Sequence, residues 1–282
     1  MASLKVLAFL VLTALLAVLV VIQQRASGAY LAEFSATQAD EARHFVSGLA
    51  VADYLGAGAP AAGPFLQDYA LRFPAFSLTG FFSLYYVAEG LWVSAFTSAT
   101  PSVLLLSAFL AALLVVGAGW VAGQALGTLL GVTVGALMIA APPLREAAVV
   151  VGLDLPLALL ALAAALAYGA YLVHGRRRDA LLFTLAAAGA VLTEPSGLAL
   201  VLLPPFAVLL SGRWRLLRRG SFWLPLIAIG LLAVPQLLGA GAPGQGGAPE
   251  VTPEVLASRL DAVSAGIGGI FLVLAGIGAA FA

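Results

Sequence analysis

Two acids and two potential cations stand close together near the start of this 282-residue chain. They occur in the run Asp40-Glu41-Ala42-Arg43-His44, where Asp40 and His44 are four residues apart and would share one face of a helix. A carboxylate can accept a proton from a nucleophile, and a guanidinium can bind a phosphate through two parallel hydrogen bonds. The spacing could place a carboxylate and a guanidinium near one reacting centre. It would equally suit the solvated start of a helix on a membrane surface, where the helix dipole favours acids.

A second set of polar residues lies later in the chain, beside apolar segments. Arg145 follows a pair of prolines, and Asp154 precedes Leu155-Pro156 at the expected start of an apolar helix. An arginine at the end of a span, away from other basic residues, suits a phosphate ligand because its planar fork matches phosphate oxygens. Asp154 would serve either as an acid of the same site or as the cap of its helix. Glu194 is a further candidate acid, in a proline-containing turn.

The rest of the chain belongs in a lipid bilayer. Hydrophobic residues make up 62% of it and charged residues only 9%, and its mean hydropathy is strongly positive, which excludes a soluble globular domain. Windows such as 6–24 and 90–144 contain no charged residue, whereas about 20 apolar residues suffice for a spanning helix. We predict an all-α fold of about eight apolar segments, a polytopic transmembrane helical bundle that forms a single domain over residues 1–282.

Composition also restricts the partners. The formal net charge is zero, so no overall field attracts nucleic acid to the chain. There is no cysteine, and the two histidines are far apart in sequence, which argues against a Cys- or His-based metal site. We therefore expect membrane lipid as a partner, no nucleic acid and no cofactor, and we leave a metal requirement open.

The arginines predict the orientation. Dense clusters occur only at 176–178 and 213–219, each after an apolar run, which is typical of cytoplasmic loops. With Lys5 on the same side, the first span leads to an extracytoplasmic loop at 23–79 that carries an amphipathic interfacial helix. A second extracytoplasmic loop is expected at 239–263. The chain is thus predicted to be a multi-pass protein of the cell membrane, with a cytoplasmic N-terminus and its candidate site outside.

An odd number of crossings must separate the first outer loop from the first arginine cluster, yet four apolar segments lie between them. These segments are approximately Gly80–Phe96, Val103–Gly119, Val121–Ala141 and Leu155–Val173. We expect Gly80–Phe96 not to cross fully, because it carries Glu89 and a crowd of aromatic residues of the kind that settle at the membrane interface. A pair of half-helices near Gly117–Gly127 would satisfy the count equally well.

Several of these features follow one another along the chain: the first span, Asp40-Glu41-Ala42-Arg43, Arg145, Asp154-Leu155-Pro156-Leu157 and Thr193-Glu194-Pro195-Ser196-Gly197-Leu198. In this order they resemble the membrane-embedded GT-C glycosyltransferases. The closest likeness is to glycosyltransferase family 39, the group of protein mannosyltransferases and lipid A aminoarabinose transferases. The resemblance implies a GT-C-like bundle that transfers a sugar from a polyprenyl-phosphate donor to an acceptor at the outer face of the membrane. The family's later spans are absent, so its C-terminal part is predicted to be missing.

The resemblance also implies roles for individual residues. Asp40 would be the catalytic acid that acts as general base on the acceptor, and Asp154 the second acid, which positions acceptor or donor. Arg43 and Arg145 would hold the donor phosphate. The supporting residues would be Glu41, His44 and Glu194.

Two other classes of function remain open from the sequence. A noncatalytic membrane subunit would pack against a partner, and the many Gly and Ala residues allow close helix packing. A transporter would place its charges along a path near the middle of the membrane, and Glu89 is the residue that suggests it.

Overall fold

The computed structural model describes residues 2–31, 34, 39–73, 76 and 83–239, which form helices and turns and, over these ranges, no strand. The helices are α1 (Ala2–Ala26), α2 (Ala39–Gly56), α3 (Ala62–Arg72), α4 (Leu84–Ala95), α5 (Thr100–Leu126), α6 (Thr128–Ala140), α7 (Pro142–Ala147), α8 (Asp154–His174), α9 (Arg177–Thr193), η1 (Pro195–Leu202), α10 (Leu203–Ser211), η2 (Trp214–Arg218) and α11 (Gly220–Gly239). The predicted second outer loop and the final apolar run lie, from residue 240 on, outside the described residues.

The all-helical class is confirmed, and three helices are long and apolar enough to cross a membrane. They are Lys5–Ala26, Thr100–Leu126 and Asp154–His174. Shorter apolar helical segments follow at Thr128–Ala140, Pro195–Ser211 and Gly220–Leu232. These findings indicate a membrane protein by helix length and composition.

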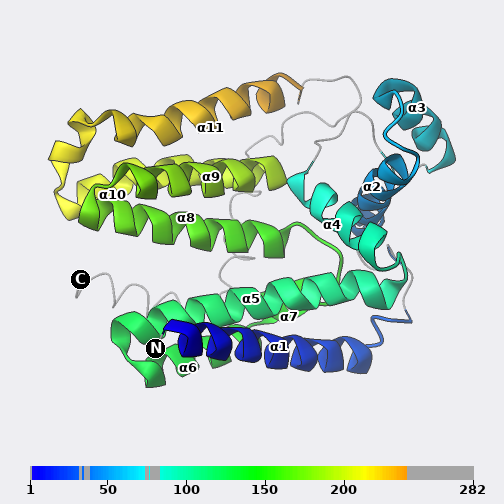
Figure 1. Ribbon diagram of the computed structural model, residues 1–282, viewed down its shortest axis with the longest axis horizontal. Coiled ribbons are helices and arrows are strands. Elements are labelled where there is room, and N and C mark those ends of the chain that lie inside the picture. Colours follow the sequence, from blue (N-terminus) through cyan, green and yellow to red (C-terminus); the bar gives the residue numbers. More distant parts are fainter. Residues whose placement is uncertain (1, 32–33, 35–38, 74–75, 77–82, 240–282) are drawn as a thin grey trace, which may run out of the picture.

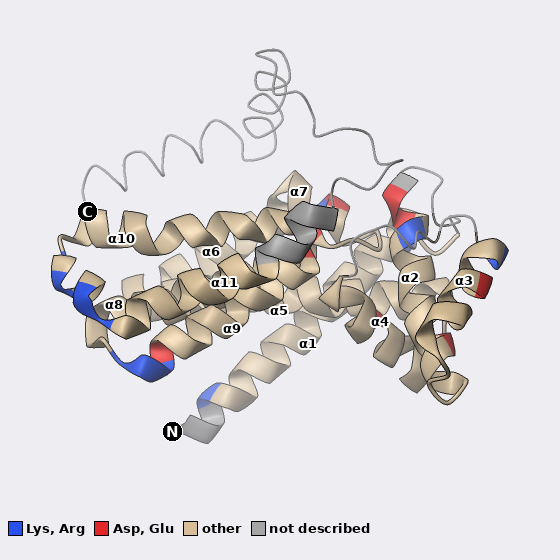
Figure 2. Cartoon of the chain, turned by 90° about the horizontal axis from the view of Figure 1, so that it is seen from above, with Lys and Arg blue, Asp and Glu red and all other residues tan. Residues whose placement is uncertain are grey.

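The apolar helices lie side by side, and the polar helices gather at one end of them. In Figure 1, α1, α5, α6, α8, α9 and α11 run alongside one another, while α2, α3 and α4 form a group at the right. We call this group, together with residues 148–154, the acid end. The opposite end, which holds 175–178 and 213–219, is the arginine end. Figure 2 shows Lys and Arg gathered at the arginine end, and most Asp and Glu at the acid end together with a few basic residues. In the sequence, Asp179 directly follows the arginines 176–178.

A tight turn and two arginines close the arginine end. Gly175, with a φ of +64°, ends α8 in the left-handed conformation that glycine adopts without strain. Arg219 donates to the carbonyl oxygen of Gly175 at 2.9 Å, and Arg213 donates to that of Leu172. Basic side chains thus satisfy carbonyl groups that the end of a helix leaves free.

A buried aromatic cluster joins the helices of the second half of the chain. Tyr168, Tyr171 and Phe183 are at most 2% exposed and pack between α8 and α9. The hydroxyl of Tyr171 lies 2.9 Å from that of Ser221, which ties α8 to α11. Buried tyrosines of this kind contribute both apolar area and a hydrogen bond.

The boundary between the second and third predicted spans is wrong. We predicted Val103–Gly119 and Val121–Ala141, but α5 continues without a break to Leu126, and the chain turns at Gly127 with a φ of +98°. An apolar run of good helix formers continues until a residue can reverse its direction, and a positive φ is readily available only to glycine.

Glycines bring α5 and α6 into direct backbone contact after this turn. A Cβ atom on Gly131 would lie 2.5 Å from the carbonyl oxygen of Gly119 and 2.7 Å from the Cα atom of Gly123. Such contacts are shorter than any real Cβ atom allows, so only glycine permits this approach. Small residues at a helix interface serve the same purpose in other membrane bundles.

We expect Gly131→Ala to force α5 and α6 apart and to destabilise the protein by about 1–3 kcal/mol, because the added methyl group would meet backbone atoms that cannot move aside. The matched control is Gly169→Ala in α8, where a Cβ atom would meet nothing within 4 Å. Thermal unfolding of the detergent-solubilised protein measures both. The packing argument fails if Gly131→Ala melts at or above the wild-type temperature.

Candidate active site

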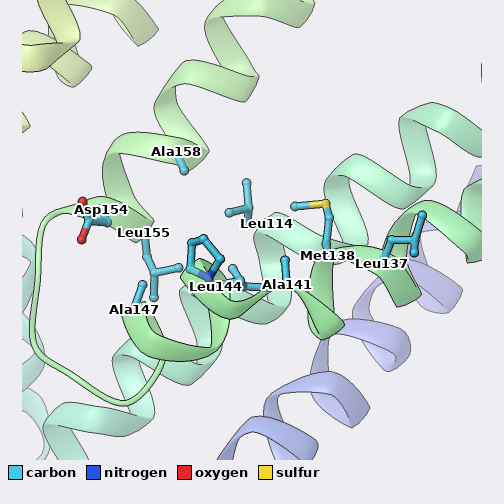
Figure 3. Close-up of a pocket in the computed structure, with 10 residues that line it drawn as sticks. Leu114, Leu137, Met138, Ala141, Leu144, Ala147, Asp154, Leu155 and Ala158 are labelled. Carbon is cyan, nitrogen blue, oxygen red and sulfur yellow. The ribbon is translucent and has the colours of Figure 1, made fainter. Parts of the chain in front are cut away.

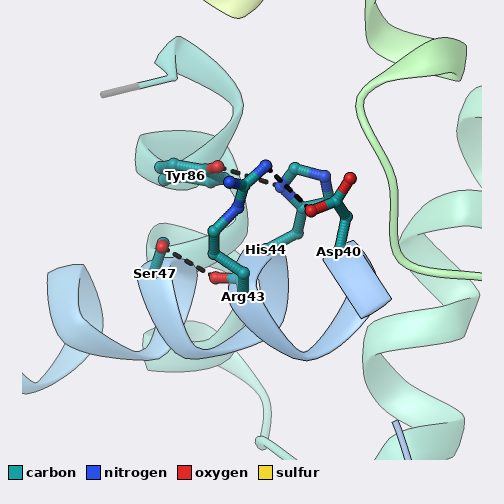
Figure 4. Close-up of polar contacts among 5 residues, drawn as sticks. All are labelled: Asp40, Arg43, His44, Ser47 and Tyr86. Carbon is teal, nitrogen blue, oxygen red and sulfur yellow. Dashed lines mark hydrogen bonds and ion pairs between the residues drawn. The ribbon is translucent and has the colours of Figure 1, made fainter. Parts of the chain in front are cut away.

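The first turn of α2 presents a carboxylate and a guanidinium at the acid end (Figure 4). Nη2 of Arg43 lies 3.1 Å from Oδ1 of Asp40. The Asp40 side chain is 70% exposed and the Arg43 side chain 44%. Exposed pairs of this kind contribute at most about 1 kcal/mol, so both groups remain available to a ligand at little cost.

His44 lies behind this pair and is buried. It is 8% exposed, and its Nδ1 atom lies 2.9 Å from the hydroxyl of Tyr86 on α4. Burial lowers the pKa of His44, and the positive charge of Arg43 lowers it further. The carboxylates of Asp40 and Asp154 oppose this shift. The net lowering favours the neutral ring. Asp154 belongs to the same end of the molecule, because the segment that leads into it is bonded at Val151 to Glu41 of α2.

The start of a surface helix would place Glu41 in solvent, but its side chain is buried. It is 6% exposed, and its Oε1 atom accepts a hydrogen bond of 2.9 Å from the backbone N–H of Val151. Glu41, His44 and Ser47 form a buried polar row, because the close packing of α4 covers this side of α2. Of the charged residues at the start of α2, Asp40 and Arg43 are therefore solvated, as expected for an interfacial helix, and Glu41 is not.

The segment 148–153, which leads into Asp154, is held by side chains from three helices. Besides Glu41, Gln24 of α1 donates to the carbonyl oxygen of Ala148 at 2.7 Å, and Ser107 of α5 donates to that of Val150 at 3.1 Å. Gln24 is fully buried, and it also donates to the carbonyl oxygen of Leu104 at 2.8 Å. These bonds set the position at which α8 begins.

An apolar cavity of about 360 Å³ opens beside the start of α8 (Figure 3). It lies among α5, α6, α7 and α8, and its walls include Leu114, Met138 and Leu144. Among the described residues that line it, Asp154 alone is charged. Figure 3 shows the Asp154 carboxylate at the edge of the cavity and directed away from the apolar side chains. The cavity therefore has an apolar body with one exposed carboxylate beside its mouth, which suits a ligand with an apolar part and a polar head.

Arg145 lies on the α1 side of α7 and does not line the Asp154 cavity. Its backbone carbonyl accepts a hydrogen bond of 3.2 Å from Gln23, and its side chain borders a narrow hollow with Gln23 and Val20. The structure thus groups Asp40, Arg43 and Asp154 around His44 but leaves Arg145 apart from them.

Glu194 ends α9 at the acid end. Its backbone N–H donates to the carbonyl oxygen of Ala190, and the side chain is partly buried. The neighbouring Thr193 accepts a 2.7 Å hydrogen bond from Ser83, the residue that caps α4. Glu194 therefore stands near the base of α4, and no described contact links it to Asp40 or Asp154.

Glu89 is the most deeply buried carboxylate of the described residues. It is 0% exposed, and neither oxygen has a hydrogen-bond partner among those residues. The carboxylate lies directly against Gly48 of α2, where a Cβ atom would overlap it. Burial raises the pKa of Glu89 well above its usual range, which keeps the group neutral. Glu89 thus belongs to the interface between α2 and α4, and its place there lends no support to a path along the membrane.

Sequence reasoning missed the residues that position the site. Gln24 and Ser107 are polar residues at or within apolar helices, and a buried role is indistinguishable in sequence from a solvated one. Ser107 gives one signal, since it falls in the charge-free window 90–144, where an uncharged donor must find a partner inside the protein. Gln24, between Gln23 and Arg25, gives none. Tyr86 is one of the aromatic residues of Gly80–Phe96 that the sequence assigns to the membrane interface, and nothing in its spacing predicts the contact with His44.

Among the residues that the structure describes, no group of three or more His, Asp or Glu side chains could hold a metal ion.

Comparison with known proteins identifies no relative of this chain. No protein-family model matches the chain, and no curated protein or solved structure matches it either. The resemblance to glycosyltransferase family 39 therefore rests on the residues of this chain alone.

We expect Gln24→Leu to destabilise the protein by about 2 kcal/mol, because an apolar side chain of similar size would remove the buried donor that binds the carbonyl oxygens of Leu104 and Ala148. The matched control is Gln23→Leu, since Gln23 makes one exposed hydrogen bond. Thermal unfolding in detergent would compare the two. Equal melting temperatures for both variants would contradict the anchoring role of Gln24.

The raised pKa of Glu89 predicts a pH-dependent stability. The folded protein retains this proton at pH values at which the unfolded chain, with a glutamate pKa of about 4.3, has released it. Stability is therefore greatest below that value and falls as the pH rises towards the folded-state pKa, by at most about 1.4 kcal/mol per pH unit. Glu89→Gln should remove this slope and raise the melting temperature at neutral pH.

Melting temperatures measured from pH 5 to pH 9 test this expectation. Glu146→Gln, at an exposed glutamate of α7, is the control and should leave the slope unchanged. Parallel pH profiles for the wild type and Glu89→Gln would show that Glu89 is not the titrating group.

Proposed function

We propose that this protein transfers a sugar from a polyprenyl-phosphate donor to an acceptor at the acid end of its helical bundle. The observation that carries the proposal is the grouping of Asp40, Arg43 and Asp154 around His44, beside an apolar cavity that Asp154 borders. A lipid-linked sugar requires this combination, since its chain is apolar and its head carries a phosphate and a sugar. The resemblance to family 39 supports the same reaction.

The orientation follows from the charges at the two ends. In the proposed topology the arginine end faces the cytoplasm, because clustered Arg residues favour that side, and the acid end faces outward. Asp40 and Asp154 then lie on the extracytoplasmic side of the cell membrane, where a lipid-linked donor would present its head.

The proposed reaction is a substitution at the anomeric carbon of the sugar. A lone pair on the acceptor oxygen or nitrogen forms the new bond, while the bond from the anomeric carbon to the phosphate oxygen breaks and its electron pair leaves with the lipid phosphate. Asp40 takes the proton that the acceptor loses, a step worth about 10²–10⁴-fold in rate. Arg43, adjacent to Asp40, stabilises the charge that develops on the leaving phosphate.

Asp154 has a different position and therefore a different proposed role. It borders the cavity, whereas Asp40 lies on α2 with its side chain largely in solvent. We assign Asp154 to orient the sugar at the mouth of the cavity, and the cavity to receive the first part of the polyprenyl chain. A volume of about 360 Å³ holds only that part, so the rest of the chain would lie among membrane lipids.

Arg145 is a weaker part of the proposal, because it lies on the other side of α7 from the cavity. A contact with the donor phosphate would require its long side chain to reach around α7. The proposal therefore depends on Arg43 as the phosphate ligand.

We expect Asp40→Asn and Asp154→Asn each to lower transfer by about 10²-fold or more, because the amide neither accepts the proton nor binds the sugar hydroxyls as a charged group. The measurement is incorporation of labelled sugar from a polyprenyl-phosphate donor in membranes that contain the protein. The matched control is Asp68→Asn, which breaks a similar exposed ion pair, with Arg72, on α3.

Full activity of both site variants would refute the proposed mechanism. If all three variants, including Asp68→Asn, lost activity to the same extent, the losses would reflect folding, and the assignment of Asp40 and Asp154 would fall.

A further inference from the structure

A second cavity lies at the acid end, between the end of α1 and the start of α5. Its volume is about 570 Å³, and its lining shares no residue with that of the Asp154 cavity. The walls come from the last turn of α1, the last turn of α4 and the first turns of α5, together with the turn that follows α1. Val21 and Leu105 supply apolar surface, and Trp92 and Phe96 form an aromatic pair with their ring centroids 4.4 Å apart.

Two aromatic polar groups of this cavity are paired within the protein, whereas its one charged group is not in an ion pair with any described residue. The indole N–H of Trp92 donates to the carbonyl oxygen of Ser102 at 2.9 Å, and the Tyr30 hydroxyl donates to Gln24 at 3.0 Å. Arg25, by contrast, is exposed, and among the described residues it forms no ion pair. Its guanidinium carbon lies 6.0 Å from the centre of the Tyr30 ring, a weak contact that leaves the N–H groups free.

The position of Arg25 points to a lipid. It is in the last turn of α1, a candidate membrane-spanning helix of which little is buried within the protein, so lipid chains would cover most of that helix. A guanidinium at the end of such a helix lies at the level of lipid headgroups and matches phosphate oxygens bidentately. Trp92 and Tyr30 beside it are of the residue types that are enriched in the same interfacial layer.

We propose that this cavity binds the headgroup of one anionic glycerophospholipid. The phosphodiester would accept hydrogen bonds from Arg25, and the upper part of the acyl chains would lie against Val21 and Leu105. The charge argues for an anionic lipid, because a zwitterionic headgroup would bring its own cation to a site that already holds one. This site is independent of the proposed transfer reaction, and its occupant would pin the end of α1 to the start of α5.

The test is retention of lipid by the purified protein in native mass spectrometry, titrated separately with phosphatidylglycerol and with phosphatidylcholine. We expect one tightly held copy of phosphatidylglycerol. Arg25→Gln should weaken its binding by about tenfold or more, because it removes the charge-assisted hydrogen bonds. The matched control is Arg72→Gln, which removes an exposed arginine of α3 and makes the same change in net charge.

A second variant, Leu105→Trp, retains Arg25 and fills the cavity, and it should abolish the tight copy even if Arg25→Gln folds poorly. Binding that is equal in the wild type and Leu105→Trp would overturn the proposal. So would an equal loss in Arg25→Gln and Arg72→Gln, since that would show attraction to net charge alone, or equal retention of the two lipids. These outcomes leave the transferase proposal untouched, because the assay measures no sugar transfer.

Discussion

Backbone groups inside an apolar protein must find hydrogen-bond partners within it, and this constraint governs the segment 148–153. Gln24, Ser107 and Glu41 meet it from three different helices. These bonds set the position at which α8 begins, and therefore the position of Asp154. They also position one wall of the apolar cavity and the charged groups near His44. The candidate site is thus built on buried polar side chains that touch no ligand in the proposed reaction.

The interface between α2 and α4 makes a similar use of small residues. Gly48 and Gly90 allow the two helices to approach so closely that a side chain on either would overlap its neighbours. The same approach encloses Glu89 and turns Glu41 and His44 inward. The polar row between the helices therefore follows from glycine packing. An amphipathic pattern alone would have left these side chains on the surface.

Hydropathy and arginine spacing were sufficient to predict a helical membrane protein with Asp40 and Asp154 at the same end. They were insufficient for the turn at Gly127, because a long Ala-, Leu- and Gly-rich run has no pattern that distinguishes one glycine from the next. The side of α7 on which Arg145 lies depends on packing against α1, which a sequence does not encode locally. The burial of Gln24 could not be predicted for a related reason, since a glutamine at the end of an apolar run has the same sequence context whether it is solvated or buried.

The length of α6 has a consequence for how a substrate would arrive. Its 13 residues rise about 20 Å, less than the roughly 30 Å of a bilayer's hydrocarbon core. In the proposed orientation, α7 and the cavity beside it therefore sit below the outer surface, within the lipid layer. In that orientation a lipid-linked molecule would enter the cavity sideways from the membrane and meet Asp154 at the outer boundary of the hydrocarbon core, where α8 begins, whereas a water-soluble acceptor would approach from above, past Asp40.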